Sequence, residues 1–164
     1  GGVVYVMPSP VSLRHGRPHA RVVQWLCNYS DETPGTVVAD DTTSVLGDES
    51  EPQPDALMIL EPEVGGRTTA DPNGYIVGPP ELAAEVAHST ASIDLNAKKA
   101  DYEKAGVREY VVFLVREQAV RWFVRRGTRF EELAAGAGGL LRSETFPGLW
   151  LDPAAFFDRT PRRH

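Results

Sequence analysis

Two carboxylates and a lysine are the residues of this chain whose types and spacing best suit catalysis. Asp55 opens the apolar run 56–60, and Glu85 lies inside a second apolar run. Lys98 follows on a predicted helix. A carboxylate inside an apolar strand is costly unless it is paired or binds a metal. Carboxylates that hold Mg²⁺ or Mn²⁺, beside an ammonium that stabilises negative charge, are the groups that a metal-dependent phosphodiesterase needs.

The two carboxylates are expected to lie on strands that can pair. Alternate side chains of a strand share one face, so Asp55 and Glu85 can converge if their strands are neighbours. A backbone carbonyl near Val86 is a candidate third metal ligand, with water filling the remaining positions. Glu81 shares the face of Glu85 but lies about 13 Å further along the strand. This distance is too long for one shared ion, so we interpret Glu81 as a charge at the strand entrance.

A predicted helix at 93–105 places Asp94, Lys98 and Tyr102 four residues apart along one stripe. Asp94 and Lys98 could form a surface ion pair, or Lys98 could point back over the Glu85 strand towards a metal. The spacing alone leaves both interpretations open. Tyr102 is expected to pack with its hydroxyl hydrogen-bonded. Asp94 and Tyr102 are therefore candidate neighbours of the catalytic groups.

Two histidines near the start of the chain are four residues apart, at His15 and His19. Gly16 and Pro18 argue against a helical zinc pair, because both residues disfavour a helix interior. Pro18 instead fits the first turn of a helix that ends near Tyr29.

The bulk composition indicates a globular chain without a membrane-spanning segment. Its 164 residues suit one domain over residues 1–158, followed by a basic tail at 159–164. No apolar run approaches the roughly 20 residues of a membrane-spanning helix. The single cysteine, Cys27, cannot form an internal disulfide, and we expect a cytoplasmic location. Because the chain starts without Met, we also expect a native segment to precede Gly1.

The formal net charge of −6 argues against a broad electrostatic grip on nucleic acid. A nuclease is not excluded, because a local basic patch and a bound metal can hold DNA. The arginines between positions 116 and 129 are the candidate patch. We interpret them instead as residues of solvated strand edges.

The order of the predicted elements is typical of an α+β (mixed α/β) fold. Strands are predicted at 3–7, 36–39, 55–60, 82–87, 109–115, 120–125 and 129–133, and helices at 18–29, 93–105 and 153–158. The segment 61–80 is rich in proline and glycine, and we expect a long loop that could form a lid. These elements predict a central mixed sheet flanked by helices.

Several short motifs together resemble the Uma2 family. They are Pro54-Asp55, the segment 74–82, Glu85-Val86, Ser89-Thr90, Asp94-Leu95 with Lys98 and Tyr102, the segment 105–110, and the segment 146–149. The resemblance extends from about residue 2 to residue 157. Each motif is short, but the combination is specific.

The resemblance implies a restriction-endonuclease-like core of the PD-(D/E)XK type, with Asp55 and Glu85 as metal ligands. That broad pattern has a lysine two residues after the glutamate, where this chain has Ala87. In the Uma2 pattern the lysine lies on the following helix, which implies Lys98. The family also has an early histidine, so His15 is expected near the site, beside the metal ligands or the substrate.

The residues support three functional hypotheses. The first is a Mg²⁺- or Mn²⁺-dependent endonuclease that hydrolyses DNA, as a homodimer or higher homo-oligomer. The second is a catalytically retired nuclease fold that serves as a homo-oligomeric binding protein, with the apolar hairpin from Tyr110 to Val115 at its interface. The third is an ordinary mixed domain in which Glu85 pairs with Lys98 and no metal binds.

Overall fold

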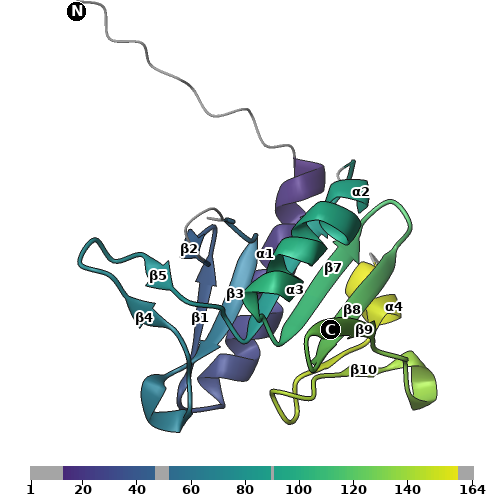
Figure 1. The fold of residues 1–164 in the computed structure, drawn as a ribbon. Helices are drawn as coiled ribbons and strands as arrows, with labels where there is room; N and C mark the ends of the chain where they lie inside the picture. Colours follow the sequence, from purple (N-terminus) through teal and green to yellow (C-terminus); the bar gives the residue numbers. More distant parts are fainter. Residues whose placement is uncertain (1–12, 47–51, 90, 159–164) are drawn as a thin grey trace, which may run out of the picture.

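The structure is a computed structural model of the chain, and it describes residues 13–46, 52–89 and 91–158 (Figure 1). The helices are α1 (Leu13–Asp31), α2 (Ala91–Ile93), α3 (Lys99–Ala105) and α4 (Pro153–Phe157), with a π-helical turn (Asp94–Lys98) between α2 and α3 and 3-10 turns at Pro62–Val64 and Ala137–Gly139. The strands are β1 (Thr36–Asp40), β2 (Ser44–Val45), β3 (Ala56–Leu60), β4 (Thr69–Ala70), β5 (Ile76–Val77), β6 (Leu82–Ala87), β7 (Glu109–Leu114), β8 (Ala119–Arg126), β9 (Arg129–Glu132), β10 (Leu141–Arg142) and β11 (Trp150–Leu151). The predicted strand 3–7 and the predicted tail 159–164 lie outside the described residues.

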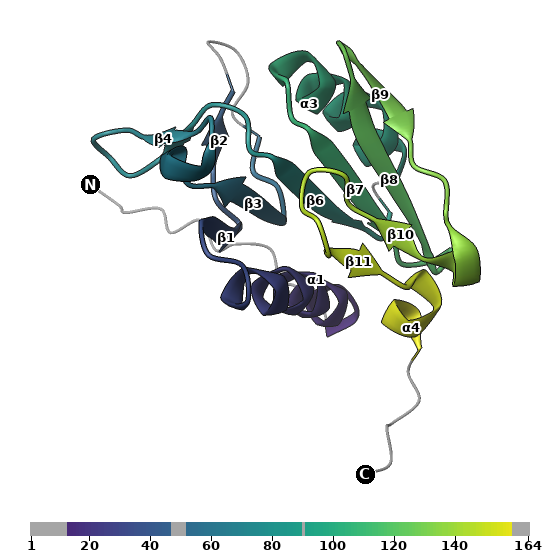
Figure 2. The same ribbon diagram turned by 90° about the horizontal axis from the view of Figure 1, so that it is seen from below.

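Six strands form one mixed sheet in the order β1-β3-β6-β7-β8-β9. The β6–β7 pair is parallel, and the other neighbours are antiparallel. A parallel pair requires a crossover connection, and here α2, the π-helical turn and α3 supply it. Figure 2 shows α3 on one face of the sheet and α1 with α4 on the other. The predicted central mixed sheet flanked by helices is therefore confirmed.

Each face of the sheet has its own hydrophobic core. On one face, α1 packs through Val22 and Leu26 against strand residues that include Phe113. On the other face, Tyr102 of α3 packs against Tyr110 of β7, with ring centroids 4.9 Å apart. Burial of each large apolar side chain contributes about 1.5–3 kcal/mol. These two cores fix both helical layers relative to the strands.

Helix α1 begins earlier than the sequence predicts. It starts at Leu13, so Gly16 and Pro18 lie inside it. Pro18 cannot donate a backbone hydrogen bond, but the buried apolar face of α1 stabilises the helix through this position. The argument that these two residues interrupt the helix between His15 and His19 is therefore wrong.

The hairpin β7–β8 is confirmed, but its predicted use as an oligomer interface is wrong. Every residue of β7 is buried, including the apolar run that starts at Tyr110. The strand lies between β6 and β8 at the centre of the sheet. A partner chain therefore cannot reach this strand without opening the fold.

The long segment 61–80 contains more regular structure than predicted. Its strands β4 and β5 pair with each other, and β5 also pairs with β2 to form a three-stranded sheet. Figure 1 shows this small sheet as an arm beside β1. At its end, Glu81 is fully buried, accepts a hydrogen bond from the Leu60 N–H at 2.8 Å, and pairs with Arg67. Glu81 therefore anchors this segment to β3.

No helix in the described parts of the chain combines the length and the apolar character that crossing a membrane requires.

A second buried carboxylate, Glu109 at the start of β7, holds the C-terminal segment on the sheet. Its oxygens accept hydrogen bonds from the Trp122 indole, the Ser143 hydroxyl and the backbone N–H groups of Glu144 and Thr145. The side chain is completely buried. Each donor would lose its partner if this carboxylate were removed. Glu109 therefore has a structural role: it connects β7 to β8 and to the segment after β10.

We expect Glu109→Gln to destabilise the fold by about 2–3 kcal/mol, because an amide NH₂ would face buried N–H donors and leave them unsatisfied. The free energy of unfolding in urea measures this effect. Glu131→Gln, at an exposed position of β9, is the matched control and should change stability by less than about 0.5 kcal/mol. Equal stability of the two variants would contradict the role of Glu109.

Candidate functional site

The register between β3 and β6 brings the two predicted carboxylates together. Ala56 pairs with Ala84 in an antiparallel ladder, so continuing the register by one residue places Asp55 opposite Glu85. Residues directly opposite each other on paired strands have neighbouring side chains. Asp55 also accepts a hydrogen bond from the Val86 N–H through Oδ2 at 2.6 Å. The predicted convergence is thus present in the structure.

The carbonyl of Val86 lies on the same side of β6 as its N–H, because both backbone groups of a strand residue point towards the same neighbouring strand. That N–H points to Asp55. The register places Pro54 opposite Val86, and proline has no N–H to donate to a carbonyl. Pro54 therefore donates no hydrogen bond to the Val86 carbonyl, which points to the side of β6 on which Asp55 lies.

Lys98 reaches the carboxylates from the π-helical turn. Its Nζ lies 3.2 Å from Glu85 Oε2 and 3.0 Å from Asp94 Oδ1. Asp94 is buried, whereas the Lys98 side chain is 37% exposed. Short π-helical segments are frequent at functional sites. Of the two interpretations of Lys98, the structure shows the one in which the ammonium points to Glu85, and it shows the pair with Asp94 as well.

Two buried tyrosines hold the acidic residues in place. The Tyr102 hydroxyl donates to Glu85 Oε1 at 3.1 Å, and the Tyr110 hydroxyl donates to the Asp94 carbonyl at 2.9 Å. Burial and the nearby Glu85 raise the pKa of Tyr102, so its hydroxyl keeps the proton that it donates. Tyr102 is hydrogen-bonded as the sequence predicts, and its partner is Glu85.

Asp55, Glu85, Asp94 and Lys98 form a carboxylate cluster whose protonation depends strongly on burial. Burial raises the pKa of Glu85 to about 8; Lys98 opposes this shift, while Asp55 and Asp94 add to it. Burial by itself disfavours the Lys98 ammonium, but Glu85 and Asp94 outweigh it and raise the pKa of Lys98. Near neutral pH, Glu85 therefore holds a proton far more often than an exposed glutamate does.

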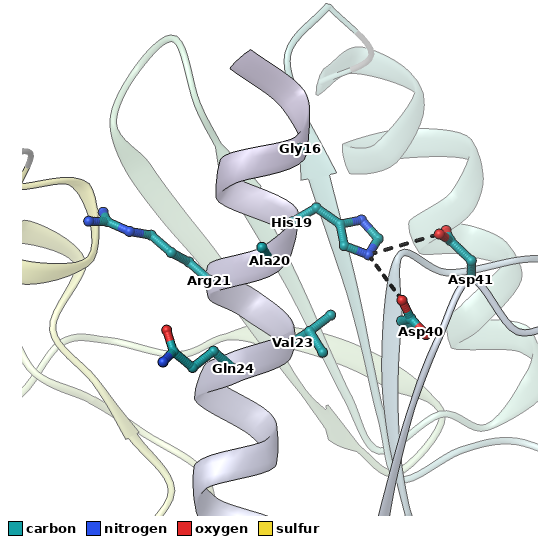
Figure 3. A pocket seen from close by; sticks show the side chains of 8 residues that line it. All are labelled: Gly16, His19, Ala20, Arg21, Val23, Gln24, Asp40 and Asp41. Atoms are coloured by element: carbon teal, nitrogen blue, oxygen red, sulfur yellow. Dashed lines mark ion pairs between the residues drawn. The ribbon is translucent and has the colours of Figure 1, made fainter. Parts of the chain in front are cut away.

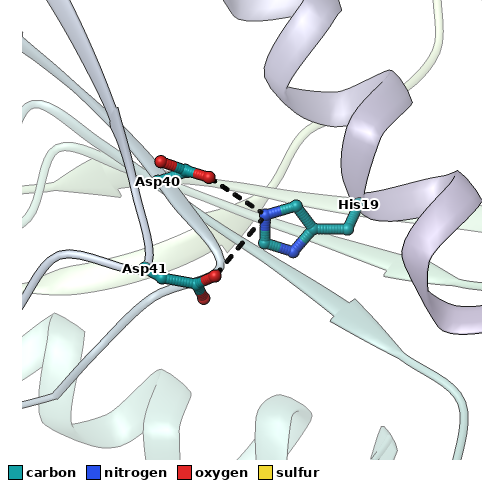
Figure 4. Close-up of side chains that lie close together, drawn as sticks. All are labelled: His19, Asp40 and Asp41. Atoms are coloured by element: carbon teal, nitrogen blue, oxygen red, sulfur yellow. Dashed lines mark ion pairs between the residues drawn. The ribbon is translucent and has the colours of Figure 1, made fainter. Parts of the chain in front are cut away.

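A histidine that the sequence analysis set aside contacts the same cluster. His19 Nδ1 lies 3.8 Å from Asp55 Oδ1. His19 Nε2 lies 3.8 Å from Asp40 Oδ2 and 3.9 Å from Asp41 Oδ2, the two contacts drawn in Figure 4. Asp40 and Asp41, two consecutive acids after a β-branched strand, were the signal in the sequence for this group. The sequence alone did not indicate that they lie beside α1. The predicted neighbour His15 also lies on α1, and its side chain is outside the described residues.

A cavity of about 820 Å³ opens between α1 and the end of β1. Figure 3 shows His19, Asp40 and Asp41 at this cavity, with the imidazole pointing from the helix towards both aspartates. His19 lines this cavity and also faces Asp55, so it lies between the cavity and that carboxylate.

Three arginines of β8 and β9 are paired with glutamates, and the fourth, Arg125, donates to the Glu103 carbonyl. The pairs are Arg121 with Glu132, Arg126 with Glu144 and Arg129 with Glu103. Exposed pairs of this kind add little stability, but they cancel the positive charge of the arginines. The pairing agrees with the interpretation of these residues as solvated strand edges.

A solved structure with a similar fold comes from Anabaena variabilis ATCC 29413 and is described as "a putative nuclease belonging to DUF820". It is 16% identical to this chain with a TM-score of 0.69, and the match covers 92% of this chain and 83% of that chain. This likeness shows the shared fold. Among proteins with curated descriptions, none matches the chain.

The family model of Uma2 carries the description "Putative restriction endonuclease" and matches residues 1–154. The matched part includes every residue of the carboxylate cluster, from Asp55 through Glu85 to Lys98. It also spans the complete six-stranded sheet and the crossover helices. The chain therefore belongs to the Uma2 family.

Proposed function

We propose that this protein is a Mg²⁺- or Mn²⁺-dependent endonuclease that hydrolyses phosphodiester bonds of DNA. One observation carries the proposal: Asp55 accepts a hydrogen bond from the N–H of Val86, next to Glu85, and the Lys98 ammonium lies 3.2 Å from Glu85. The family description, a restriction endonuclease, supports the same class of reaction.

The donor set fits a hard divalent cation. Asp55 and Glu85 offer carboxylate oxygens and Val86 offers a carbonyl oxygen, and oxygen ligands are those that Mg²⁺ and Mn²⁺ prefer. The partial exposure of the Asp55 side chain, 19%, leaves room for water and a phosphate. A cation bound by these residues would polarise a phosphoryl oxygen of the substrate and would activate a water molecule.

Lys98 is the candidate catalytic cation of the protein itself. Its ammonium is held by Asp94 and Glu85, and its partial exposure allows contact with a phosphate. A fixed positive charge next to a phosphoryl group stabilises the extra negative charge of the transition state. Tyr102 and Asp94 act as positioning residues, because they orient Glu85 and Lys98.

The purely structural interpretation also expects a Glu85–Lys98 pair, so this contact does not separate the two hypotheses. They differ in their expectations for a divalent cation. In the structural interpretation, the ion pair is complete and adding Mg²⁺ changes nothing. In the nuclease proposal, a cation replaces the proton on Glu85, because ligands bind metals in their deprotonated forms.

The same proposal treats residues 1–158 as one catalytic domain that acts in the cytoplasm as a homodimer or higher homo-oligomer. The single Cys27 suits a reducing compartment. Exposed apolar side chains at Tyr75 and Val77 of the arm, and at Val64 of the 3-10 turn before it, offer a surface that a second copy could cover.

Titration calorimetry with Mg²⁺ tests the cation site. We expect binding to the wild type and no detectable binding to Glu85→Gln or Asp55→Asn, because each variant keeps its shape but loses a charged ligand. Glu63→Gln, an exposed position in a 3-10 turn, is the matched control and should bind as the wild type does. Binding of Mg²⁺ that survives in both ligand variants would contradict the assignment.

Cleavage of supercoiled plasmid DNA in Mn²⁺ tests the role of Lys98. We expect Lys98→Met to lower the cleavage rate by about 10²–10³-fold, as loss of one charge-stabilising group does in other active sites. Lys104→Met, at an exposed position of α3, is the control and should retain the wild-type rate. Rates for Lys98→Met within about twofold of the wild type would remove Lys98 from the mechanism.

The pH dependence of stability tests the competition between a proton and a cation at Glu85. Without metal, the pKa of about 8 in the folded chain exceeds the usual value of 4.5. The stabilising contribution of this group is therefore fully present below about pH 4.5 and is lost as the pH rises to about 8.

Unfolding in urea with EDTA, between about pH 5 and pH 8.5, measures this loss. We expect the wild type to lose about 1–4 kcal/mol more than Glu85→Gln over this range. Saturating Mn²⁺ should reduce the difference, because the ion binds the deprotonated carboxylate. Identical pH profiles of the wild type and Glu85→Gln in EDTA would show that Glu85 has no raised pKa.

A further inference from the structure

We propose that His19, Asp40 and Asp41 form a second cation site, suited to a divalent transition metal such as Zn²⁺ or Mn²⁺. Within the residues that the structure describes, they are the one group of at least three potential ligands whose donor atoms all lie within 4.8 Å of one another. The site is separate from the Asp55–Glu85 pair, and it stands even if that pair binds nothing.

The distances suit a metal after small side-chain rotations. His19 Nε2 lies 3.8 Å from Asp40 Oδ2 and 3.9 Å from Asp41 Oδ2. A tetrahedral cation with bonds of about 2.0–2.2 Å holds its ligand atoms about 3.4 Å apart. Each aspartate oxygen therefore needs to approach the imidazole nitrogen by only about half an ångström, and the two carboxylate oxygens already lie within 4.8 Å of each other. The two aspartates are exposed at the surface, so their side chains can make this movement.

The ligand types distinguish this site from the oxygen-only site of the proposed function. An imidazole nitrogen with two carboxylates favours Zn²⁺ and other transition metals over Mg²⁺. The second ring nitrogen, Nδ1, faces Asp55 Oδ1 at 3.8 Å. A carboxylate beside the non-ligating nitrogen of a metal-binding histidine orients the ring and increases its basicity. Asp55 is placed to have this effect on His19.

The backbone turns both aspartates towards the histidine. Consecutive strand residues normally point to opposite faces, but Asp41 follows the last residue of β1 with a left-handed φ of 42°. Its N–H donates to the Asp55 carbonyl at 3.2 Å, and its own carbonyl accepts from Gln53 Nε2 at 2.7 Å. The turn is therefore tied to the segment that precedes β3, and through it to Asp55.

The setting favours an accessible metal over a closed structural one. His19 is 16% exposed, whereas the Asp40 side chain is 61% exposed. His19, Asp40 and Asp41 line the cavity of about 820 Å³ beside α1 (Figure 3). Three protein ligands and an open side are typical of a metal that also binds water or substrate. A cation here would also neutralise two aspartates that otherwise repel a phosphate backbone.

Nuclear magnetic resonance of the histidine rings tests the proposal without an activity assay. Long-range proton–nitrogen correlations are recorded during a Zn²⁺ titration, and His19→Gln assigns the His19 signals. Glu85→Gln is used in parallel, because it disables the first site. We expect Zn²⁺ to shift the Nε2 signal of His19 both in the wild type and in Glu85→Gln. If Glu85→Gln no longer binds Mg²⁺ but still shows the Zn²⁺-induced shift of His19, the two cations bind at different sites.

The double variant D40N/D41N removes two carboxylate charges and should weaken Zn²⁺ binding at His19 by at least about tenfold. Asparagine tolerates a left-handed φ, so the turn at Asp41 is kept. The matched control D31N/E32Q removes two exposed charges at the other end of α1 and should bind as the wild type does. Unshifted His19 signals at saturating Zn²⁺, or equal affinity in D40N/D41N and the wild type, would overturn the site.

Discussion

The buried carboxylate of Glu85 is the constraint on which the rest of this site depends. It lies in the middle of a fully buried strand, with 2% of its surface exposed. An uncompensated charge in such a place is strongly destabilising. The Tyr102 hydroxyl and the Lys98 ammonium provide the compensation, and both come from the crossover helices. The position of those helices is therefore linked to the protonation state of one side chain.

The connection between the parallel strands explains how the helix reaches Glu85. Because β6 and β7 are parallel, the chain must cross over one face of the sheet between them. The β6 residues that flank Glu85 on this face, Ala83 and Ala87, are small and fully buried. They leave space for Tyr102 to pack between helix and sheet. The same topology that builds the core therefore brings an ammonium and a hydroxyl to the carboxylate.

The sequence predicted the parts of the site that follow from local rules. Strand alternation was sufficient to place Asp55 and Glu85 on one face, because their strands pair directly. The orientation of Lys98 needed the family resemblance, because spacing alone allowed a surface pair with Asp94. The His19 group was missed because it depends on two exceptions to local rules. Helix α1 continues through Pro18, and Asp41 adopts a left-handed conformation; both are stabilised by contacts distant in sequence.

Asp55 has a different structural position from Glu85, although both are proposed ligands of the same cation. One oxygen of Asp55 accepts the Val86 N–H, and the other faces His19. Its carboxylate thus lies where the start of β3 meets α1, whereas the hydrogen-bond and ion-pair partners of Glu85 described by the structure, Tyr102 and Lys98, come from the crossover side. Neutralising Asp55 therefore alters the surroundings of both ligand groups, while neutralising Glu85 alters one. The asymmetry makes Glu85 the residue whose substitution reports on the proposed nuclease site alone.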